Sequence, residues 1–264
     1  MPLSAAADAT FLGEAPGDGA GKSLAAVGDV NGDGYDDFLI GAPFNDYAGA
    51  EAGQAYLILG KPEAWAKGIS LSNANASFPG EQAQDRAGLA IAGAGDINRD
   101  GLDDFLIGAP GNAGQHGAET GKSYLLFGKQ SLWGLRFPLS AANASFLGEA
   151  KGDFSGATLA GVGDVNGDGI DDFMIGAIHN SQTAFKAGKA YLFFGRITGW
   201  NRNTGLAFAD ASFLGKTAYD YAGYQLAGGG DVNADGLADI LISAVGDDDP
   251  AQDSGRVFLL LGKL

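Results

Sequence analysis

Short apolar segments bounded by Gly, Asp and Asn alternate with polar turns along this chain. They are too short for core helices and are rich in Leu, Ile, Phe and Tyr, a pattern that predicts β-strands. No stretch shows a sustained helical period between caps. Four kinds of segment recur in the same order, and their first copies read KSLAAVG, DFLIGAP, GQAYLILGK and, ahead of these, ATFLGE.

The segments belong to a repeat of about 67 residues, and four strands in that length are typical of a propeller blade. We expect repeats at about 9–63, 76–131, 144–198 and 211–264, within a single domain spanning 1–264. The predicted fold is an all-β propeller of four four-stranded blades. The N-terminal strand is expected to pair into the last blade and close the ring, which would remove both open edges. The alternative is an arc of a larger ring, cut at a repeat boundary.

The composition is that of a folded, acidic protein, which limits the partners that it could bind. The chain has 264 residues, of which 45% are hydrophobic and 45 are glycine, with a formal net charge of −16. The hydrophobic content allows a real core, and the glycines suit many tight turns. The negative charge argues against nucleic acid and anionic membranes, because both bind basic surfaces. Cysteine is absent, and we find no membrane-spanning run or export signal.

One polar loop between strands repeats as DVNGDGYDD (29–37), DINRDGLDD (96–104), DVNGDGIDD (164–172) and DVNADGLAD (231–239). Oxygen side chains at positions one, three, five and nine converge as the loop curls, and these hard ligands select calcium. The side-chain ligands would be Asp29, Asn31, Asp33 and Asp37; Asp96, Asn98, Asp100 and Asp104; Asp164, Asn166, Asp168 and Asp172; and Asp231, Asn233, Asp235 and Asp239. The backbone carbonyls at position seven would come from Tyr35, Leu102, Ile170 and Leu237. The sequence thus predicts four Ca²⁺ sites.

Two other interpretations of these loops were weighed. An EF-hand needs a bidentate Glu at position twelve, where this chain has Ile40, Ile107, Ile175 and Ile242. Plain Asx turns are the second alternative, but four copies with all side-chain ligands present favour metal. Because carboxylates packed closely destabilise each other, we expect calcium to stabilise the blades in structural sites.

Paired motifs flank each loop. They are Ala20-Gly21 with Gly41-Ala42-Pro43, Ala87-Gly88 with Gly108-Ala109-Pro110, Ser155-Gly156 with Gly176-Ala177-Ile178, and Ala222-Gly223 with Ser243-Ala244-Val245. With the loops, they make nearly the whole chain resemble the FG-GAP repeat, the blade unit of integrin α-subunit heads and many bacterial surface proteins. The resemblance implies calcium loops on the bottom face of a propeller and a binding surface on the top face. The Phe of the family's name is missing, four blades depart from about seven in integrins, and no RGD triplet or inserted domain is present.

Three further features repeat or cluster. Trp65, Trp133 and Trp200 recur at one repeat position, either as a sugar platform or, as we favour, as packing between blades. Asp18, Asp85, Asp153 and Asp220 form a second series, either as a ring of carboxylates near the axis or, as we favour, as caps of local turns. His116 and His179 make a weak catalytic case, and no nucleophile elbow or phosphate loop appears.

The loops between second and third strands, 44–52, 111–120, 179–187 and 246–254, differ most between repeats. Variable loops on a repetitive scaffold are where specificity usually lies. We therefore expect a non-enzymatic, extracellular or cell-surface adhesion module that binds a protein or glycan through these loops. A closed ring would make it a monomer. The alternatives are a hydrolase or lyase with a site in the central channel, and a structural segment of a larger surface protein.

Overall fold

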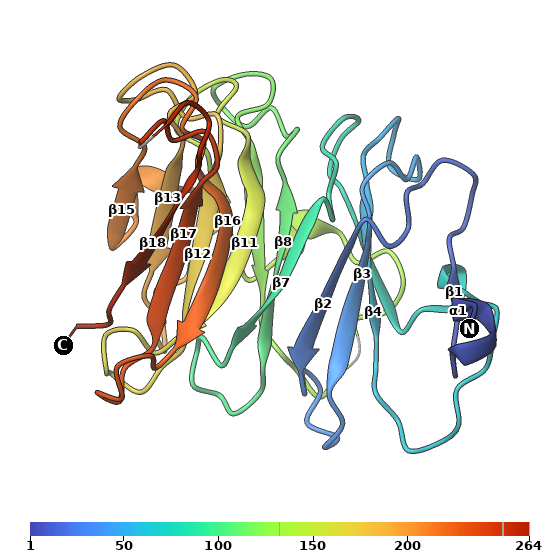
Figure 1. Ribbon diagram of the computed structural model, residues 1–264. Helices are drawn as coiled ribbons and strands as arrows, with labels where there is room; N and C mark the ends of the chain where they lie inside the picture. Colours follow the sequence, from blue (N-terminus) through green and yellow to red (C-terminus); the bar gives the residue numbers. More distant parts are fainter. Residues whose placement is uncertain (132, 250, 264) are drawn as a thin grey trace.

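The computed structural model describes residues 1–131, 133–249 and 251–263, and every statement of absence below refers to these residues. The fold is all-β, and each repeat forms one sheet that stands beside the next along an arc (Figure 1). The only α-helix among these residues is α1 (Leu3–Ala6), and three 3-10 turns η1 (Leu71–Asn73), η2 (Leu139–Ala141) and η3 (Leu206–Phe208) precede outer strands. None of these helices is long and apolar enough to cross a membrane.

Three sheets share one strand order. The first contains β2 (Ser23–Gly28), β3 (Asp37–Ala42), β4 (Gln54–Ile58) and β6 (Ala76–Pro79). The second contains β7 (Ala90–Gly95), β8 (Asp104–Ala109), β9 (Lys122–Leu126) and β10 (Ala144–Leu147), with β14 (Thr204–Gly205) parallel to β10. The third contains β11 (Ser155–Gly163), β12 (Asp172–Ala177), β13 (Lys189–Phe193) and β15 (Ala211–Leu214). The strand pairs within each repeat are antiparallel, as blades of a propeller require.

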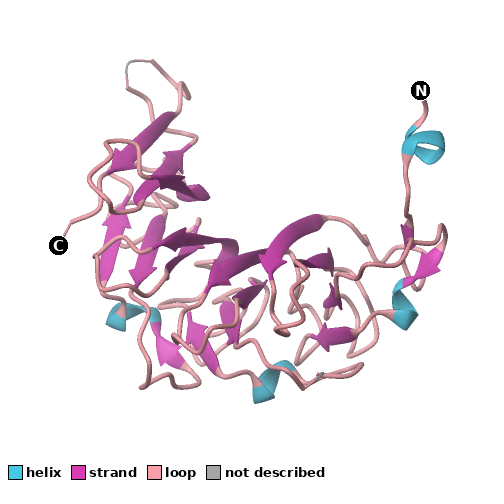
Figure 2. Cartoon of the chain, turned by 90° about the horizontal axis from the view of Figure 1, so that it is seen from below, coloured by secondary structure: helices cyan, strands magenta, loops and turns pink. Residues whose placement is uncertain are grey.

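The fourth sheet has three strands, β16 (Ala222–Gly230), β17 (Asp239–Ala244) and β18 (Arg256–Leu260). The expected closure by the N-terminal strand is wrong for this structure. The strand β1 (Phe11–Leu12) pairs in parallel with β5 (Ile69–Ser70), and the two chain ends lie at opposite ends of an open arc (Figure 2). The reason is curvature. The Phe11 ring contacts Phe38 and Trp65 of the first blade, at 5.5 and 5.8 Å between ring centroids, as Phe78 contacts Phe105 and Trp133 of the second, but the arc does not bring the fourth sheet round to β1.

The hydrophobic core lies between neighbouring sheets rather than within one of them. One cluster joins Leu39 and Leu57 of the first sheet to Phe105 and Tyr124 of the second, all fully buried. The innermost strands β2, β7, β11 and β16 contact one another in sequence. They are rich in Ala and Gly because the backbones approach closely, and a Cβ on Gly161 would lie 2.5 Å from the carbonyl oxygen of Gly93. Each blade therefore depends on the next for burial.

Candidate metal loops and the opposite loop face

The first calcium-type loop is closed by its own carboxylate. Asp29 accepts backbone hydrogen bonds from Gly32 at 2.7 Å, Asp33 at 3.1 Å and Gly34 at 2.7 Å. The Asn31 amide donates to the Asp33 carboxylate at 2.9 Å. These bonds curl the loop and bring the side chain of Asn31 against that of Asp33.

The other three loops repeat this geometry. Asp96, Asp164 and Asp231 accept from the fifth- and sixth-position amides, and Asn98, Asn166 and Asn233 donate to the carboxylate two residues on. All four loops join a first to a second strand at one end of the sheets, opposite the loops between second and third strands (Figure 1). This is the two-faced arrangement that the FG-GAP resemblance implies.

The aspartate at position nine lies in a different environment. Asp37 is buried, and its two oxygens accept from Val30 at 3.1 Å and from Gly60 at 2.7 Å. The corresponding bonds hold Asp104, Asp172 and Asp239. Burial raises the pKa of Asp37 to about 6, of Asp104 to about 8 and of Asp172 to about 7. This residue ties the start of each loop to the end of the third strand.

The donor set was tested for a divalent cation. In the described ranges no group of three or more Asp, Glu, His or Cys side chains is arranged to hold a metal. Two observations nevertheless fit a cation in the second loop. The Asn98 side chain is a predicted ligand at position three of the loop. Its Oδ1 atom is buried and receives no hydrogen bond from the residues that the structure describes. The charges of Asp96 and Asp100 also raise the pKa of Asp104, although less than its burial does. A positive ion would offset both the burial of an oxygen without a hydrogen bond and the repulsion among these carboxylates.

A contact between blades was missed by the sequence reasoning. The Asp103 carboxylate accepts the backbone N–H of Asp29 in the preceding blade at 2.9 Å, and Asp171 accepts that of Asp96 at 3.0 Å. Burial raises the pKa of Asp103 and of Asp171. The signal was present as the first Asp of each Asp-Asp pair, which the last loop replaces with Ala238. One calcium-type loop is thus anchored to the next.

The second Asp series caps turns, as we favoured. Asp85 accepts the backbone amides of Glu81 and Gln82, each at 3.0 Å, and the Asn112 side chain at 3.1 Å. Asp18, Asp153 and Asp220 also accept amides of their own turns. Burial raises the pKa of Asp85 and Asp153. Because these carboxylates are engaged locally, they do not favour the alternative of a catalytic site in a central channel.

The repeated tryptophans pack between blades, as we also favoured. Trp133 is 9% exposed and meets Phe78 and Phe105 edge-on, with ring centroids 6.2 and 5.6 Å away. Trp200 meets Phe146 edge-on and lies tilted against Phe173, with ring centroids 6.3 and 5.9 Å away. The near-complete burial of Trp133 leaves it no flat platform for a sugar, whereas Trp65 and Trp200 are partly buried.

On the loop face, five aromatic rings form a second group that sequence reasoning missed. We call it the aromatic cluster: Phe154, His179, Phe185, Tyr219 and Tyr221, in contact from ring to ring at centroid distances of 5.3 to 6.2 Å. Phe185 is 58% exposed and Tyr219 is 50% exposed. Burial and the charge of Lys186 lower the pKa of His179. The other histidine, His116, is exposed in a different loop and is not part of the aromatic cluster.

Three rings of the aromatic cluster sit on strained backbone. Phe154, Tyr219 and Tyr221 have φ angles of 58°, 68° and 54°, in the left-handed region that bulky residues avoid. The first repeat has Gly17 and Gly19 where the last has Tyr219 and Tyr221. Comparing the residues on either side of each turn-capping Asp would have revealed this substitution. Strain of this kind concentrates at functional sites.

Comparison with known families identifies the repeat. A family profile described as "FG-GAP repeat" matches residues 20–58 and 87–126. Both matches contain an inner strand, a calcium-type loop and the two following strands. The chain is therefore an FG-GAP repeat protein with an integrin-like arrangement of blades.

Its relatives are integrin α-subunits. Integrin alpha-V of Gallus gallus is 29% identical over 252 residues, which are 94% of this chain and 21% of that protein. Integrin alpha-IIb of Homo sapiens is 34% identical over 165 residues, covering 60% of this chain and 15% of that protein. Integrin alpha-6 of Gallus gallus is 30% identical over 180 residues, covering 67% and 15%. The chain spans about a fifth or less of the length of these relatives.

Proposed function

We propose that this chain is a calcium-stabilised adhesion module, exposed outside the cell, that binds a protein partner through its loop face. The relatives support the setting, because they are integrin α-subunits by name. The loops concerned are 44–52, 111–120, 179–187 and 246–254, of which residue 250 lies outside the described residues. A glycan partner is the outcome that the binding test below would reveal instead.

Calcium binding is the stabilising half of the proposal. The Asp and Asn side chains at positions one, three, five and nine of each loop, with the position-seven carbonyls, would hold one ion per loop. The support is the fourfold repetition of the curled loop and the buried, unpartnered Asn98 Oδ1 atom. A bound ion would supply positive charge among carboxylates, and the blades would gain stability from it.

The aromatic cluster carries the binding half. Exposed aromatic side chains are enriched at protein interfaces, because they offer a large apolar area with few torsions to freeze. Phe185 and Tyr219 present that area beside one of the variable loops. The left-handed backbone of Tyr219 and Tyr221 costs stability that glycine would avoid. Gln84 and Arg86 of the second repeat have the same left-handed backbone, so the support for binding is the aromatic side chains that the last repeat carries at these positions.

The test separates binding from stability. The double variant Tyr219→Gly with Tyr221→Gly restores the residues that the first repeat uses, so its melting temperature should change little. Binding to a protein array in calcium should fall at least tenfold. The matched control is Gln84→Gly, because Gln84 has a φ of 69° at the equivalent position of the second repeat and lies outside the aromatic cluster. Unchanged binding by the double variant would refute the proposal, as would binding to glycans alone.

A further inference from the structure

The arc ends in two unpaired strand edges that match each other. In the second sheet, β10 lies between β9 on one side and β14 on the other. The strand β1 pairs with β5 as β10 pairs with β14, in parallel, but its second edge has no strand partner in the part of the chain described here. At the other end, β18 pairs with β17 and likewise has one unpaired edge. The edge of β1 lacks a third strand such as β18, and the edge of β18 lacks an outer strand such as β1.

The segment around β1 has the sequence of an outer strand. Residues 8–14 read DATFLGE. The segments that contain the three outer strands and the start of the turn after each read NASFPGE (75–81), NASFLGE (143–149) and DASFLGK (210–216). The backbone N–H and C=O groups of β1 that could pair with a further strand lie on its unpaired side. The Thr10 carbonyl accepts from Ile69 at 2.9 Å, so Phe11 turns its backbone N–H and C=O away from β5, toward the unpaired side.

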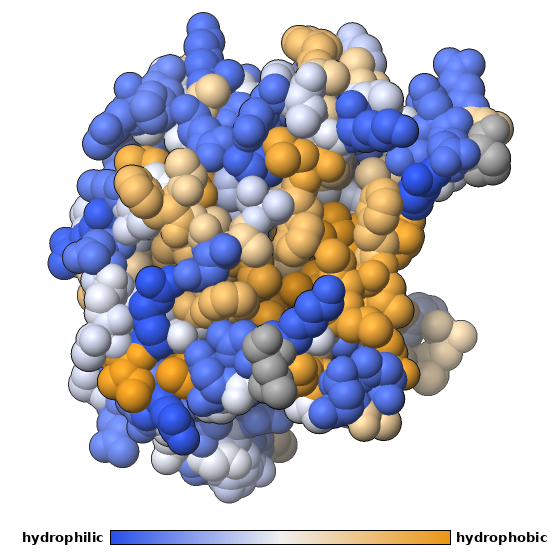
Figure 3. Space-filling model, turned by 90° about the vertical axis from the view of Figure 1, so that its left-hand side faces the viewer, coloured by the Kyte–Doolittle hydropathy of each residue, from blue (hydrophilic) through white to orange (hydrophobic). Residues whose placement is uncertain are grey.

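The edge of β18 exposes side chains that the other blades bury. Val257 is 65% exposed and Leu259 is 50% exposed, whereas Ala55 and Leu57 at the same positions of the first blade are fully buried. Figure 3 shows this end of the molecule, where apolar side chains form a broad patch between polar rims. An apolar strand edge of this kind, whose only charged residue in β18 is Arg256, is a template for pairing with another strand.

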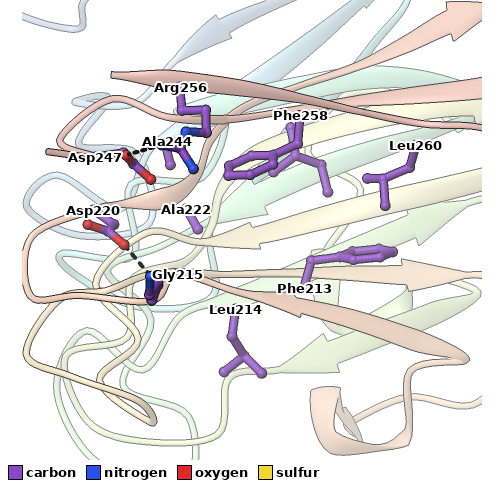
Figure 4. Close-up of a pocket in the computed structure, with 12 residues that line it drawn as sticks. Phe213, Leu214, Gly215, Asp220, Ala222, Ala244, Asp247, Arg256, Phe258 and Leu260 are labelled. Carbon is purple, nitrogen blue, oxygen red and sulfur yellow. Dashed lines mark hydrogen bonds and ion pairs between the residues drawn. The ribbon is translucent and has the colours of Figure 1, made fainter. Parts of the chain in front are cut away.

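A cavity of about 320 Å³ adjoins this edge (Figure 4). Ile242, Ala244, Phe258 and Leu260 line it, and they correspond to Ile40, Ala42, Tyr56 and Ile58 of the first blade. In the first blade those four residues cluster with Leu71 of the 3-10 turn, which is 1% exposed.

The fourth sheet has no such leucine among the described residues, but the N-terminal segment offers one. Leu3 lies ahead of β1 as Leu71, Leu139 and Leu206 lie ahead of the outer strands, with one residue more between. Those three leucines are at most 1% exposed, whereas Leu3 is 88% exposed. The N-terminal segment therefore carries both the strand and the apolar side chain that the fourth sheet lacks.

We propose that a second copy of this chain supplies residues 3–14 as the fourth strand of the last blade, head to tail. The internal blades set the register, in which Ala55 faces Phe78 and Gln54 faces Pro79. Val257 then faces Phe11 of the second copy, and Arg256 faces its Leu12. Leu3 enters the cavity, and the Gly13 N–H donates to the Gly255 carbonyl, as Gly80 donates to Gly53 at 2.9 Å.

The second copy is favoured over closure within one chain. The first blade holds β1 through β5 and through the rings of Phe38 and Trp65, which leaves the other edge of β1 free to pair. The chain ends are far apart along the arc, so that edge does not reach β18 of the same chain (Figure 2). The contact joins two different surfaces, so repetition gives either a closed ring of copies or a filament. Strand addition of this type supplies main-chain hydrogen bonds for affinity and side-chain pockets for specificity.

Cross-linking tests the register directly, because the chain contains no cysteine. Full-length Leu12→Cys is mixed with full-length Arg256→Cys under mild oxidation. These positions face each other in a pair without main-chain hydrogen bonds, where Cβ atoms lie closest. We expect a disulfide-linked dimer, and much less of it when Leu259→Cys, three residues out of register, replaces Arg256→Cys. Equal cross-linking by both mixtures would overturn the proposal.

A second measurement does not depend on thiol chemistry. The weight-average mass of the unmodified chain, by sedimentation, should rise with concentration. Val257→Pro should remain monomeric with an unchanged melting temperature, because it removes an N–H that points away from β17. A monomeric unmodified chain at every concentration contradicts the proposal. So does a Leu12→Cys/Arg256→Cys double variant that links only within one chain, which would show ring closure.

Discussion

The contact between neighbouring calcium-type loops gives a prediction whose magnitude can be worked out. Gly28 has a φ of 68°, and a Cβ placed there would overlap the Asp103 carboxylate of the next blade. In Gly28→Ala the new methyl group must displace that carboxylate, which accepts the Asp29 N–H at 2.9 Å. The substitution therefore adds left-handed strain and breaks a charge-assisted hydrogen bond.

The two costs are separable. Strain of an alanine in the left-handed region costs roughly 1–2 kcal/mol, and a hydrogen bond to a charged group contributes roughly 1.5–3 kcal/mol, so Gly28→Ala should lose about 2.5–5 kcal/mol. In an Asp103→Ala background the overlap and the bond are both gone, and Gly28→Ala should cost only about 1–2 kcal/mol. The last loop already has Ala238 at this position, so the background variant imitates a natural blade.

Guanidinium unfolding followed by tryptophan fluorescence measures this double-mutant cycle, since Trp133 lies beside the blade that carries Asp103. The four proteins should give a coupling free energy of about 1.5–3 kcal/mol between the two positions. If Gly28→Ala costs the same with and without the Asp103 carboxylate, the contact between the blades contributes nothing. The reasoning from the Cβ overlap would then be refuted.

Two other predictions concern the packing and the loop face. Trp133→Ala should lose about 3–5 kcal/mol in chemical denaturation, because it empties a buried site, and Trp65→Ala should lose clearly less, since that ring is partly exposed. Equal losses would contradict the packing assigned to Trp133. Burial lowers the pKa of His179, so the unfolded chain takes up its proton first as the solution is acidified. The stability that His179 contributes should therefore be lost as pH drops below the usual histidine pKa of about 6.5, so the difference in free energy of unfolding between the unmodified chain and His179→Phe should fall through that range. An unaltered curve would exclude His179 as the source.

The repeated elements could be predicted from the periodicity of the sequence, because each of them is formed by residues close together in the chain. The strands, the curled calcium-type loops and the turns capped by Asp85 and its counterparts depend on residues close in sequence, such as Asp29 and the amides up to Gly34. Each of these could be predicted from spacing alone. The ligand sets of the loops and the single-domain boundary stay predictions.

What the sequence did not reveal depends on curvature and on contacts between repeats. The predicted closure of the ring failed because four blades form an open arc, so Phe11 packs on Phe38 of the first blade while the fourth sheet stays at the far end of the arc. The aromatic cluster was missed because Phe154 and Tyr221 lie one repeat apart and meet only through His179 between them. Such contacts depend on the angle between blades, which no single repeat encodes.

Calcium dependence of stability tests the central claim most directly. The full chain is melted in calcium, in magnesium and in chelator, with circular dichroism of the β-structure as the readout. At a calcium concentration about a hundredfold above Kd, each occupied site should add about 2.7 kcal/mol, so the melting temperature should rise well above that in chelator. Asp33→Ala with Asp100→Ala should remove part of the rise, since both are predicted loop ligands. A melting temperature that is the same in calcium and in chelator would contradict the assignment of these loops as metal sites.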